Sequence, residues 1–169
     1  MTNSAEISRC GKYRWRLDRD VNCGETVGLF IGCNPSTADA FEDDATVRKW
    51  NGFARKLKLK KYIVINLFAY RATDVKELQN ANDVFGHGFE RYYLNAITEA
   101  DIIIPCWGSR HKIPQRFNSY INDTIRFLSF LTKPVYVFGL TKSGDPKHPL
   151  MLPYTTPLVD LRTTELFKL

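Results

Sequence analysis

The chain has 169 residues, enough for one domain with a sizeable core, and we expect residues 1–169 to form a single domain. Hydrophobic residues make up 44% of the chain and charged residues 25%. A membrane-spanning helix needs about 20 consecutive apolar residues, and no apolar run in the sequence approaches that length. We therefore expect a cytoplasmic protein without a membrane partner, and the net charge of +6 suits a polyanionic partner.

The first 26 residues are expected to contain one strand. Residues 1–11 show no clear pattern and are expected to be a loose leader. Residues 12–17 alternate aromatic or apolar side chains with basic ones, which predicts a short strand at a sheet edge. A polar loop follows over residues 18–26.

Four apolar runs predict strands that are buried on both faces, because apolar and polar residues do not alternate in them. These runs lie within residues 27–31, 62–66, 101–109 and 134–139. Polar residues follow each run, and ligands bind at the carboxyl ends of the strands in an open α/β sheet. We therefore expect Asn34, Asn66, Ser109 and His148 at one edge of the sheet.

Helical segments are predicted between these strands. Apolar residues recur at helical spacing within residues 45–59, 89–99 and 115–131. Asp44 is expected to cap the first helix, and Thr73 or Asp74 to cap a short turn. Residues 159–161 are a candidate for one more small strand or for a packing turn. The alternation predicts an α/β three-layer sandwich, with a central, mostly parallel four-stranded sheet and helices on both faces.

The cysteines and the basic residues bear on the possible ligands. Cys10, Cys23, Cys33 and Cys106 lack the spacing of a metal site, so we expect no metal and no cofactor. Basic residues crowd into one segment: Arg48, Lys49, Arg55, Lys56, Lys58, Lys60 and Lys61. The sequence leaves open whether this basic segment is a solvated helix face or a surface that contacts DNA.

Four segments, taken in chain order, resemble the uracil-DNA glycosylase superfamily. They are Gly-Cys-Asn-Pro-Ser at 32–36, Ile-Asn-Leu-Phe-Ala-Tyr-Arg-Ala at 65–72, Cys-Trp-Gly-Ser-Arg at 106–110 and Lys-His-Pro-Leu at 147–150. In order, they are similar to that superfamily's first catalytic loop, base-reading strand, Trp-Gly-Ser segment and His-Pro loop. The chain also resembles a family of bacterial and phage proteins that share Asn-Pro-Ser-Thr-Ala-Asp, Trp-Gly and His-Pro-Leu motifs. This second resemblance implies no particular activity.

The first resemblance implies a uracil-DNA glycosylase-like domain that binds DNA, flips a pyrimidine and hydrolyses its N-glycosidic bond; we expect a monomer. Asn34 would hold the attacking water, and His148 would donate a hydrogen bond to the base as negative charge develops. Asn66 offers a donor and an acceptor to the edge of the base. The alternatives are a turn histidine bonded to the backbone for His148 and a cap at the end of a strand for Asn66. Asp43 or Asp44 could orient the water or balance the sugar's positive charge, with a helix cap as the alternative for Asp44.

Further residues are expected to contact the base or the DNA backbone. The residues expected around the base are Cys33, Pro35, Ser36, Asn66, Phe68 and Trp107. Those expected at the DNA are Ser109, Arg110 and Lys112, which could bind phosphates, and Leu150 and Met151, which could wedge into the gap left by the flipped base. Plain packing is the alternative for the apolar residues of both sets.

Two positions depart from the superfamily's pattern. Asn34 stands where the most active branch has an aspartate, and Ser36 stands where the uracil-specific branch has a tyrosine that blocks the space beside C5. A serine leaves that space open, so we expect excision of a C5-modified pyrimidine, in DNA repair or in defence against phage. A non-catalytic nucleic-acid-binding module of the same fold, or an enzyme acting on free nucleotides, are the alternatives.

Overall fold

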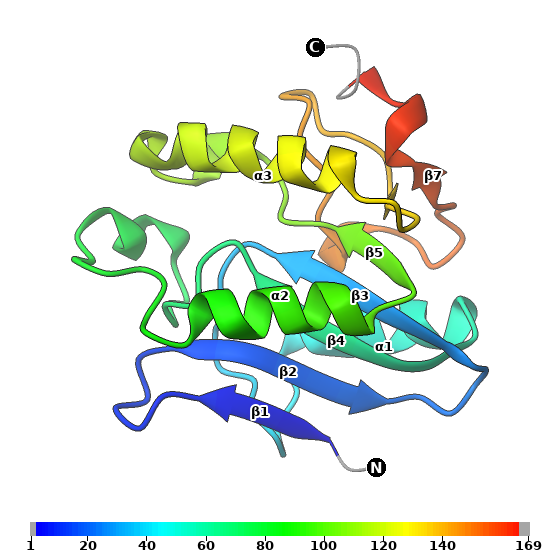
Figure 1. Ribbon diagram of the computed structural model, residues 1–169, viewed down its shortest axis with the longest axis horizontal. Coiled ribbons are helices and arrows are strands. Elements are labelled where there is room, and N and C mark those ends of the chain that lie inside the picture. Colours follow the sequence, from blue (N-terminus) through cyan, green and yellow to red (C-terminus); the bar gives the residue numbers. More distant parts are fainter. Residues whose placement is uncertain (1–2, 166–169) are drawn as a thin grey trace.

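The computed structural model describes residues 3–165 and has a five-stranded central sheet in the order β1-β2-β4-β3-β5 (Figure 1). The strands are β1 (Ser4–Ile7), β2 (Arg14–Asp20), β3 (Thr26–Gly32), β4 (Leu59–Asn66) and β5 (Ile102–Pro105). β3 pairs in parallel with β4 and β5, whereas β2 pairs antiparallel with β1 and β4. The fold is therefore α/β with a mixed central sheet.

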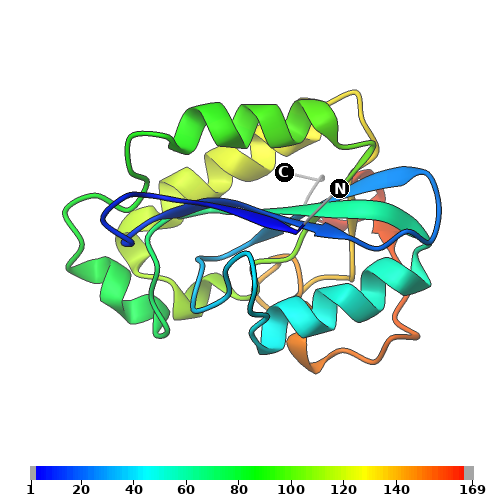
Figure 2. The ribbon, with the colours of Figure 1, turned by 90° about the horizontal axis from the view of Figure 1, so that it is seen from below.

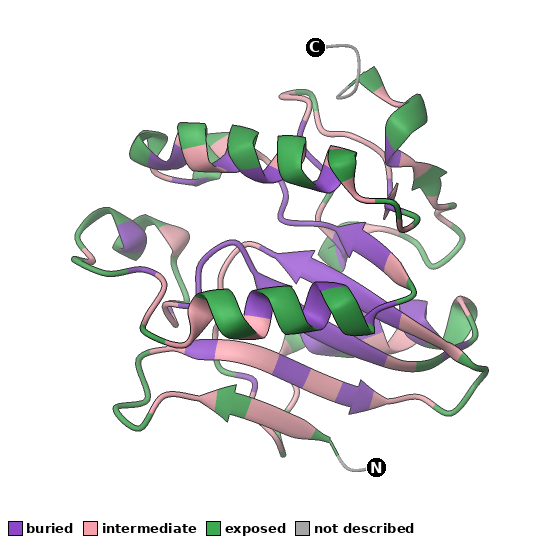
Figure 3. Cartoon of the chain, in the orientation of Figure 1, coloured by how far each residue is buried: buried purple, intermediate pink, exposed green. Residues whose placement is uncertain are grey.

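Helices cover both faces of this sheet, as Figure 2 shows with the sheet edge-on. They are α1 (Ala45–Lys56), α2 (Phe89–Glu99) and α3 (Asn118–Phe130). One buried cluster joins α1 to the sheet through Val47, Trp50 and Phe53, and a second lies under α2 and α3. The inner faces of the helices and most of β3, β4 and β5 are buried (Figure 3). None of the helices within residues 3–165 has the length and apolar character needed to cross a membrane.

Short elements complete the part of the chain that the structure describes. A small sheet pairs β6 (Tyr136–Val137) with β7 (Val159–Asp160), which confirms the strand expected near residue 159. The 3₁₀ turns are η1 (Val75–Gln79), η2 (Arg110–Lys112), η3 (Gln115–Phe117), η4 (Pro149–Met151) and η5 (Leu161–Thr163). The sequence offered Thr73 or Asp74 as the cap of this turn. Asp74 is the cap of η1 and forms a capping box with Glu77.

The expected four-stranded sheet is corrected in three places. β1 lies within the expected leader and pairs with β2, so β2 is not an edge strand. The expected strand 134–139 keeps only the two residues of β6 and reaches β5 through one bridge, between Ile103 and Val135. Gly139, at φ +94°, turns the chain at the end of this segment. The parallel part of the sheet is therefore limited to β3, β4 and β5, extended by that bridge.

The expected helices are present, with two shifted boundaries. α1 ends at Lys56 rather than near residue 59, because Lys58 adopts φ +53° and Leu59 is fully buried as the first residue of β4. α3 begins at Asn118, after the η3 turn, rather than at residue 115. Asp44 is the N-cap of α1 as expected, since its Oδ1 accepts a hydrogen bond from the Val47 N–H at 2.9 Å.

Backbone pairing between β3 and β4 continues past the ends of both strands. Gly32 and Asn66 are paired at the last position of the parallel ladder. Beyond it, the N–H groups of Leu67 and Phe68 donate to the carbonyls of Gly32 and Cys33, at 2.9 and 3.0 Å. The N–H of Ala72 donates to the carbonyl of Pro35 at 2.9 Å. Residues 32–35 and 66–72 therefore form one connected edge, and the candidate site lies along it.

Candidate active site

A cavity of about 290 Å³ opens at the carboxyl ends of β3 and β4. Its polar side chains come from five separate segments and include Arg14, Asn34, Ser36, Asp44, Asn66 and His148. The strand-end argument predicted that Asn34, Asn66, Ser109 and His148 would lie at one edge of the sheet; the structure brings Asn34, Asn66 and His148 together at the cavity, whereas Ser109 does not line it. The cavity volume is at the small end of the range for small-molecule sites.

Asn34 is held with its side-chain carbonyl unengaged. Its Nδ2 donates to the carbonyl of Ala72 at 2.8 Å and to that of Pro35 at 3.1 Å. These two acceptors identify Nδ2 and Oδ1, since a carbonyl oxygen can only accept. Within residues 3–165, Oδ1 has no hydrogen-bond partner. Asn34 can therefore offer an acceptor to a water or to a ligand hydroxyl.

Asn66 is buried at the end of β4 and lies directly against Gly32. A methyl group added at Gly32 would lie 2.6 Å from the Asn66 Nδ2, so only glycine leaves room for this amide. Arg14 donates from Nη2 to the Asn66 Oδ1 at 3.4 Å, which orients the amide. Asn66 therefore keeps Nδ2 as a donor on the cavity side.

His148 is oriented by the turn that follows it. The N–H of Leu150 donates to His148 Nδ1 at 3.3 Å, so the neutral ring carries its proton on Nε2. Burial, together with the positive charge of Lys112, lowers the pKa of His148, whereas Asp44 acts in the opposite direction. Gly108, at φ +85°, packs close to the His148 Cβ and so places the Trp-Gly turn behind the ring. His148 is thus a neutral hydrogen-bond donor at neutral pH.

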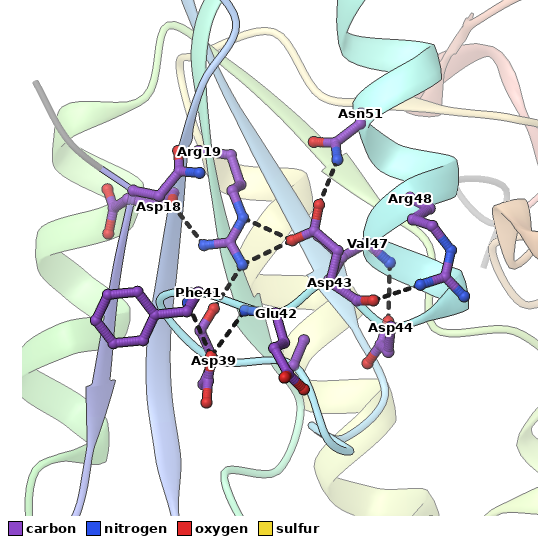
Figure 4. Close-up of polar contacts among 12 residues, drawn as sticks. Asp18, Arg19, Asp39, Phe41, Glu42, Asp43, Asp44, Val47, Arg48 and Asn51 are labelled. Carbon is purple, nitrogen blue, oxygen red and sulfur yellow. Dashed lines mark hydrogen bonds and ion pairs between the residues drawn. The ribbon is translucent and has the colours of Figure 1, made fainter.

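The two adjacent aspartates have different surroundings. Asp43 lies outside the cavity, where Arg19 donates to its Oδ1 from Nε at 2.9 Å and Asn51 donates to its Oδ2 at 2.7 Å (Figure 4). Asp44 lines the cavity and uses Oδ1 to cap α1. Within the described part of the chain, Asp44 Oδ2 has no hydrogen-bond partner. Of the two aspartates, only Asp44 both caps a helix through Oδ1 and keeps a second oxygen, Oδ2, that a ligand or a water could contact.

Arg14 is the residue of this site that the sequence did not single out. It is 2% exposed, and its Nη1 donates to the carbonyl of Ala38 at 2.9 Å. Its Nε is buried without a partner in residues 3–165. Arg14 and Arg16 occupy equivalent positions in the alternating pattern of residues 12–17, so the sequence does not indicate which of them is buried at the cavity. Only the path of β2 places Arg14 at the cavity.

The other residues expected around the base divide between the cavity and the core. Cys33 and Ser36 line the cavity, and burial raises the pKa of the Cys33 thiol to about 12, so it is not a thiolate at neutral pH. Pro35 is buried and contributes the backbone carbonyl that pairs with Ala72.

Phe68 and Trp107 lie in the core under α2 and α3 rather than at the cavity. The centres of the Phe68 and Phe117 rings lie 4.6 Å apart, and Trp107 is 3% exposed. Both match the packing alternative. The aromatic side chain that does line the cavity is Trp50, on α1.

The residues expected at the DNA also divide into two groups. Arg110 donates from Nε to Asp145 Oδ1 at 2.8 Å, and Ser109 shares a hydrogen bond with Ser143 at 2.9 Å. These two side chains belong to a network around the buried Asp145. Lys112 is exposed, and no ion pair joins it to another residue of 3–165.

Two apolar side chains lie exposed on the turn that follows His148. On η4, Leu150 is 39% and Met151 is 89% exposed. Both side chains are therefore accessible at the surface close to His148 in the sequence, as Phe41 and Phe130 are elsewhere on the molecule.

The basic segment 48–61 does not form one patch around the cavity. Lys49 lies 4.2 Å from the centre of the Tyr154 ring, and Lys61 forms an ion pair with Glu99 on α2. Lys61 lies near the start of β4, about 16 Å along the strand from Asn66 at about 3.3 Å per residue. Arg55 and Lys56 lie in the last turn of α1, whose first turn is at the cavity. Part of the segment is thus a solvated helix face.

The cavity offers both hydrogen-bond donors and hydrogen-bond acceptors to a ligand. Residues 3–165 contain no group of three or more His, Cys, Asp or Glu side chains placed to hold a metal ion. Instead, the cavity combines one carboxylate, two amides, one neutral imidazole and one guanidinium. This set offers acceptors at Asn34 and Asp44, and donors at Asn66, His148 and Arg14.

Comparisons with known proteins relate the whole site to one family. No curated protein and no solved structure matches this chain. A family model does match, over residues 14–150, and this range includes every polar side chain named above for the cavity. The chain therefore belongs to the family described as Protein of unknown function (DUF1643).

Proposed function

We propose that this protein is a DNA glycosylase, which flips a pyrimidine out of DNA and hydrolyses its N-glycosidic bond, leaving an abasic site. The observation that carries the proposal is that Asn34, Asp44 and His148 line one small cavity, with the Asn34 Oδ1 and the Asp44 Oδ2 free of hydrogen bonds within residues 3–165. We also propose that the fold is of the uracil-DNA glycosylase type. The mixed sheet with helices on both faces and the order of the four motifs support this relationship.

The cavity offers one group for each requirement of the reaction. Hydrolysis needs a water held beside C1′, and Asn34 and Asp44 offer two acceptors for its hydrogens. The departing base carries negative charge, and a neutral His148 can donate from Nε2 to an oxygen of the base without itself losing a proton. Asn66 can donate from Nδ2 to the edge of the same base.

Features outside the cavity support DNA as the substrate. Leu150 and Met151 follow the His148-Pro149 pair and are exposed, as a wedge that fills the gap of a flipped base must be. Lys112 is exposed and close enough for its charge to act on His148, where a phosphate of the backbone could lie. These positions place apolar and basic contacts next to the proposed catalytic groups.

The proposed substrate is a pyrimidine with a substituent at C5. Ser36 lines the cavity with a small side chain, so the position that a tyrosine occupies in the uracil-specific branch leaves space here. We expect release of a 5-hydroxymethylated or glycosylated pyrimidine to be faster than release of uracil, and Ser36→Tyr to reverse this order. Turnover of phage DNA with such bases would fit a role in defence.

Incubation with a panel of DNAs, including phage DNAs with modified bases, tests the proposal, with released bases identified by mass spectrometry. We expect free base and alkali-labile abasic sites with the wild type. Asn34→Ala should reduce the rate of release by about 10²–10³-fold while DNA affinity is retained. Asp43→Asn is the matched control outside the cavity. DNA binding without release of any base would favour a non-catalytic binding module, and release from free nucleosides alone would favour a nucleoside hydrolase.

A further inference from the structure

The cavity contains a buried cation, Arg14, that forms no direct ion pair within residues 3–165, although the Asp44 carboxylate is near enough to act on its charge. Arg14 is 2% exposed and lines the cavity, and its two hydrogen bonds go to the uncharged acceptors Ala38 O and Asn66 Oδ1. Its Nε is buried without a partner, and no carboxylate in residues 3–165 forms an ion pair with it. An unpaired buried charge is costly, so a cation kept in this state indicates that an anion is bound there at some stage.

We propose that Arg14 stabilises the negative charge on the departing base. This inference rests on the glycosylase function proposed above. In the reaction, the C1′–N1 bond breaks and its electron pair leaves with the base, where resonance spreads it over N1 and O2. The oxygen of the water bonds to C1′, and a water proton passes to the Asp44 carboxylate. The base anion afterwards takes a proton from solvent and Asp44 releases the proton it took, so that the products are the free base and the abasic sugar and the carboxylate is restored.

The position of Arg14 makes its effect selective for the charged base. The intact nucleotide presents a neutral base, so the guanidinium gains most when the bond breaks. A buried cation acts through a low dielectric, where its attraction to a nearby anion is stronger than in water. Burial lowers the pKa of Arg14 to about 10, against the effect of Asp44, so Arg14 remains positively charged at neutral pH.

Arg14 also acts on the base through Asn66. The bond from Nη2 to Asn66 Oδ1 holds the amide with Nδ2 free on the cavity side. A donor to the amide oxygen polarises the amide and strengthens Nδ2 as a donor. The guanidinium and the amide therefore act together on the same negative charge.

Binding of two free pyrimidines tests this inference without any turnover. 5-Nitrouracil is an anion near pH 7.5 and uracil is neutral, so calorimetry with both measures the preference of the cavity for charge. We expect the wild type to bind the 5-nitrouracil anion about 10- to 100-fold more tightly than uracil. Arg14→Met should remove this preference, and Arg14→Lys should retain part of it.

The control for these variants is Arg16→Met, on the same strand. Arg16 donates to Asp18 and Glu99 and does not line the cavity, so its substitution should leave the preference for the anion unchanged. Equal affinity of the wild type for both pyrimidines would overturn the inference. A clear preference for the anion without base release from any DNA would instead remove the proposed function and leave the anion site standing.

Kinetics on DNA show whether the charge on the leaving base matters. The same oligonucleotide would carry 5-fluorouracil, a good leaving group, or 5-hydroxymethyluracil, a poorer one. We expect Arg14→Met to slow release of the poorer leaving group by about 10²-fold and release of 5-fluorouracil by about 10-fold or less. An equal loss for both bases would show that Arg14 has a structural role only and would overturn the inference.

Discussion

Two buried arginines on β2, five positions apart, have opposite surroundings. Arg19 is 3% exposed and donates to the Asp43 carboxylate and to the carbonyls of Asp18 and Asp39 (Figure 4). Arg14 is 2% exposed and donates only to neutral acceptors. The adjacent aspartates divide in the same way, because Asp43 pairs with Arg19 and Asp44 lines the cavity.

The difference separates a structural network from a candidate site. Around Arg19, the guanidinium pairs with the Asp43 carboxylate, and Asn51 links Asp43 to the hydroxyl of Tyr62, which donates to Asn51 Oδ1 at 2.6 Å. Such a satisfied network stabilises the fold and leaves nothing for a ligand. Around Arg14, within residues 3–165, the guanidinium has no direct ion pair and Asp44 Oδ2 has no hydrogen-bond partner, which is a condition that proteins maintain mainly at functional sites.

The largest expected effect is on stability, at the Arg19 end. Asp43→Ala leaves Arg19 buried without its carboxylate, so the free energy of unfolding should fall by about 3 kcal/mol. This is the lower end of the range for buried pairs, because Asp43 keeps 28% side-chain exposure. Denaturant unfolding measures the change. Arg14→Met should change stability by less than about 1 kcal/mol, and an equal loss in both variants would remove the distinction between the two arginines.

The next effect is on activity, at Asp44. Asp44→Asn should slow base release by about 10²-fold, since it removes the charge that takes the water proton. Its stability should stay within about 0.5 kcal/mol of the wild type, because asparagine caps a helix as well as aspartate does. Asp44→Ala should lose the same activity and, in addition, about 1 kcal/mol of stability. If Asp44→Asn kept full activity, Asp44 would be a helix cap alone.

A smaller effect concerns pH and His148. Its pKa is lowered in the folded protein, so between the folded value and the ordinary value near 6.5 the unfolded chain binds more protons. The contribution of His148 to stability is therefore complete above pH 6.5 and decreases as the pH falls below it. Unfolding of the wild type and of His148→Gln from pH 7.5 to 5 measures this difference. The stability of His148→Gln should depend less on pH, and parallel curves would contradict the lowered pKa.

The smallest effect concerns DNA affinity outside the cavity. Lys112→Ala should reduce the slope of log affinity against log salt concentration by about one unit, because the Lys112 charge acts on His148 and a DNA phosphate there would release one counterion. Lys61→Ala should leave this slope unchanged, since Lys61 pairs with Glu99 at the other end of β4. Affinity measured over a series of salt concentrations tests both variants. Equal slopes for the two would place DNA elsewhere on the surface.

The strands and helices around the site could be predicted because burial on both faces leaves a clear sequence pattern. Most of β3 and the second half of β4, residues 62–65, are continuous apolar runs, and α2 has the bounds predicted by its periodicity. β1 could not be predicted in the same way. Its sequence, Ser-Ala-Glu-Ile, has no strand pattern, and pairing with β2 decides its conformation.

The site could be predicted only where a residue follows a strand or a motif. Asn34, Asn66 and His148 have such positions. Asp43 and Asp44 are neighbours of the same type, and only the direction of the chain entering α1 separates their roles. Arg14 lies in an alternating strand with other basic residues, so its burial follows from tertiary packing that the sequence does not display.

The continued pairing of residues 32–35 with 66–72 has a consequence for the dynamics of recognition. The cavity wall is ordered as part of the sheet, and Arg71 adds bonds from its guanidinium to the carbonyls of Ser36 and Thr37. The conformational entropy of this loop is therefore lost when the protein folds, so that ligand binding does not have to order the loop again. A wall of this kind admits a matching ligand quickly and discriminates by shape, because it has little freedom to adapt to any other.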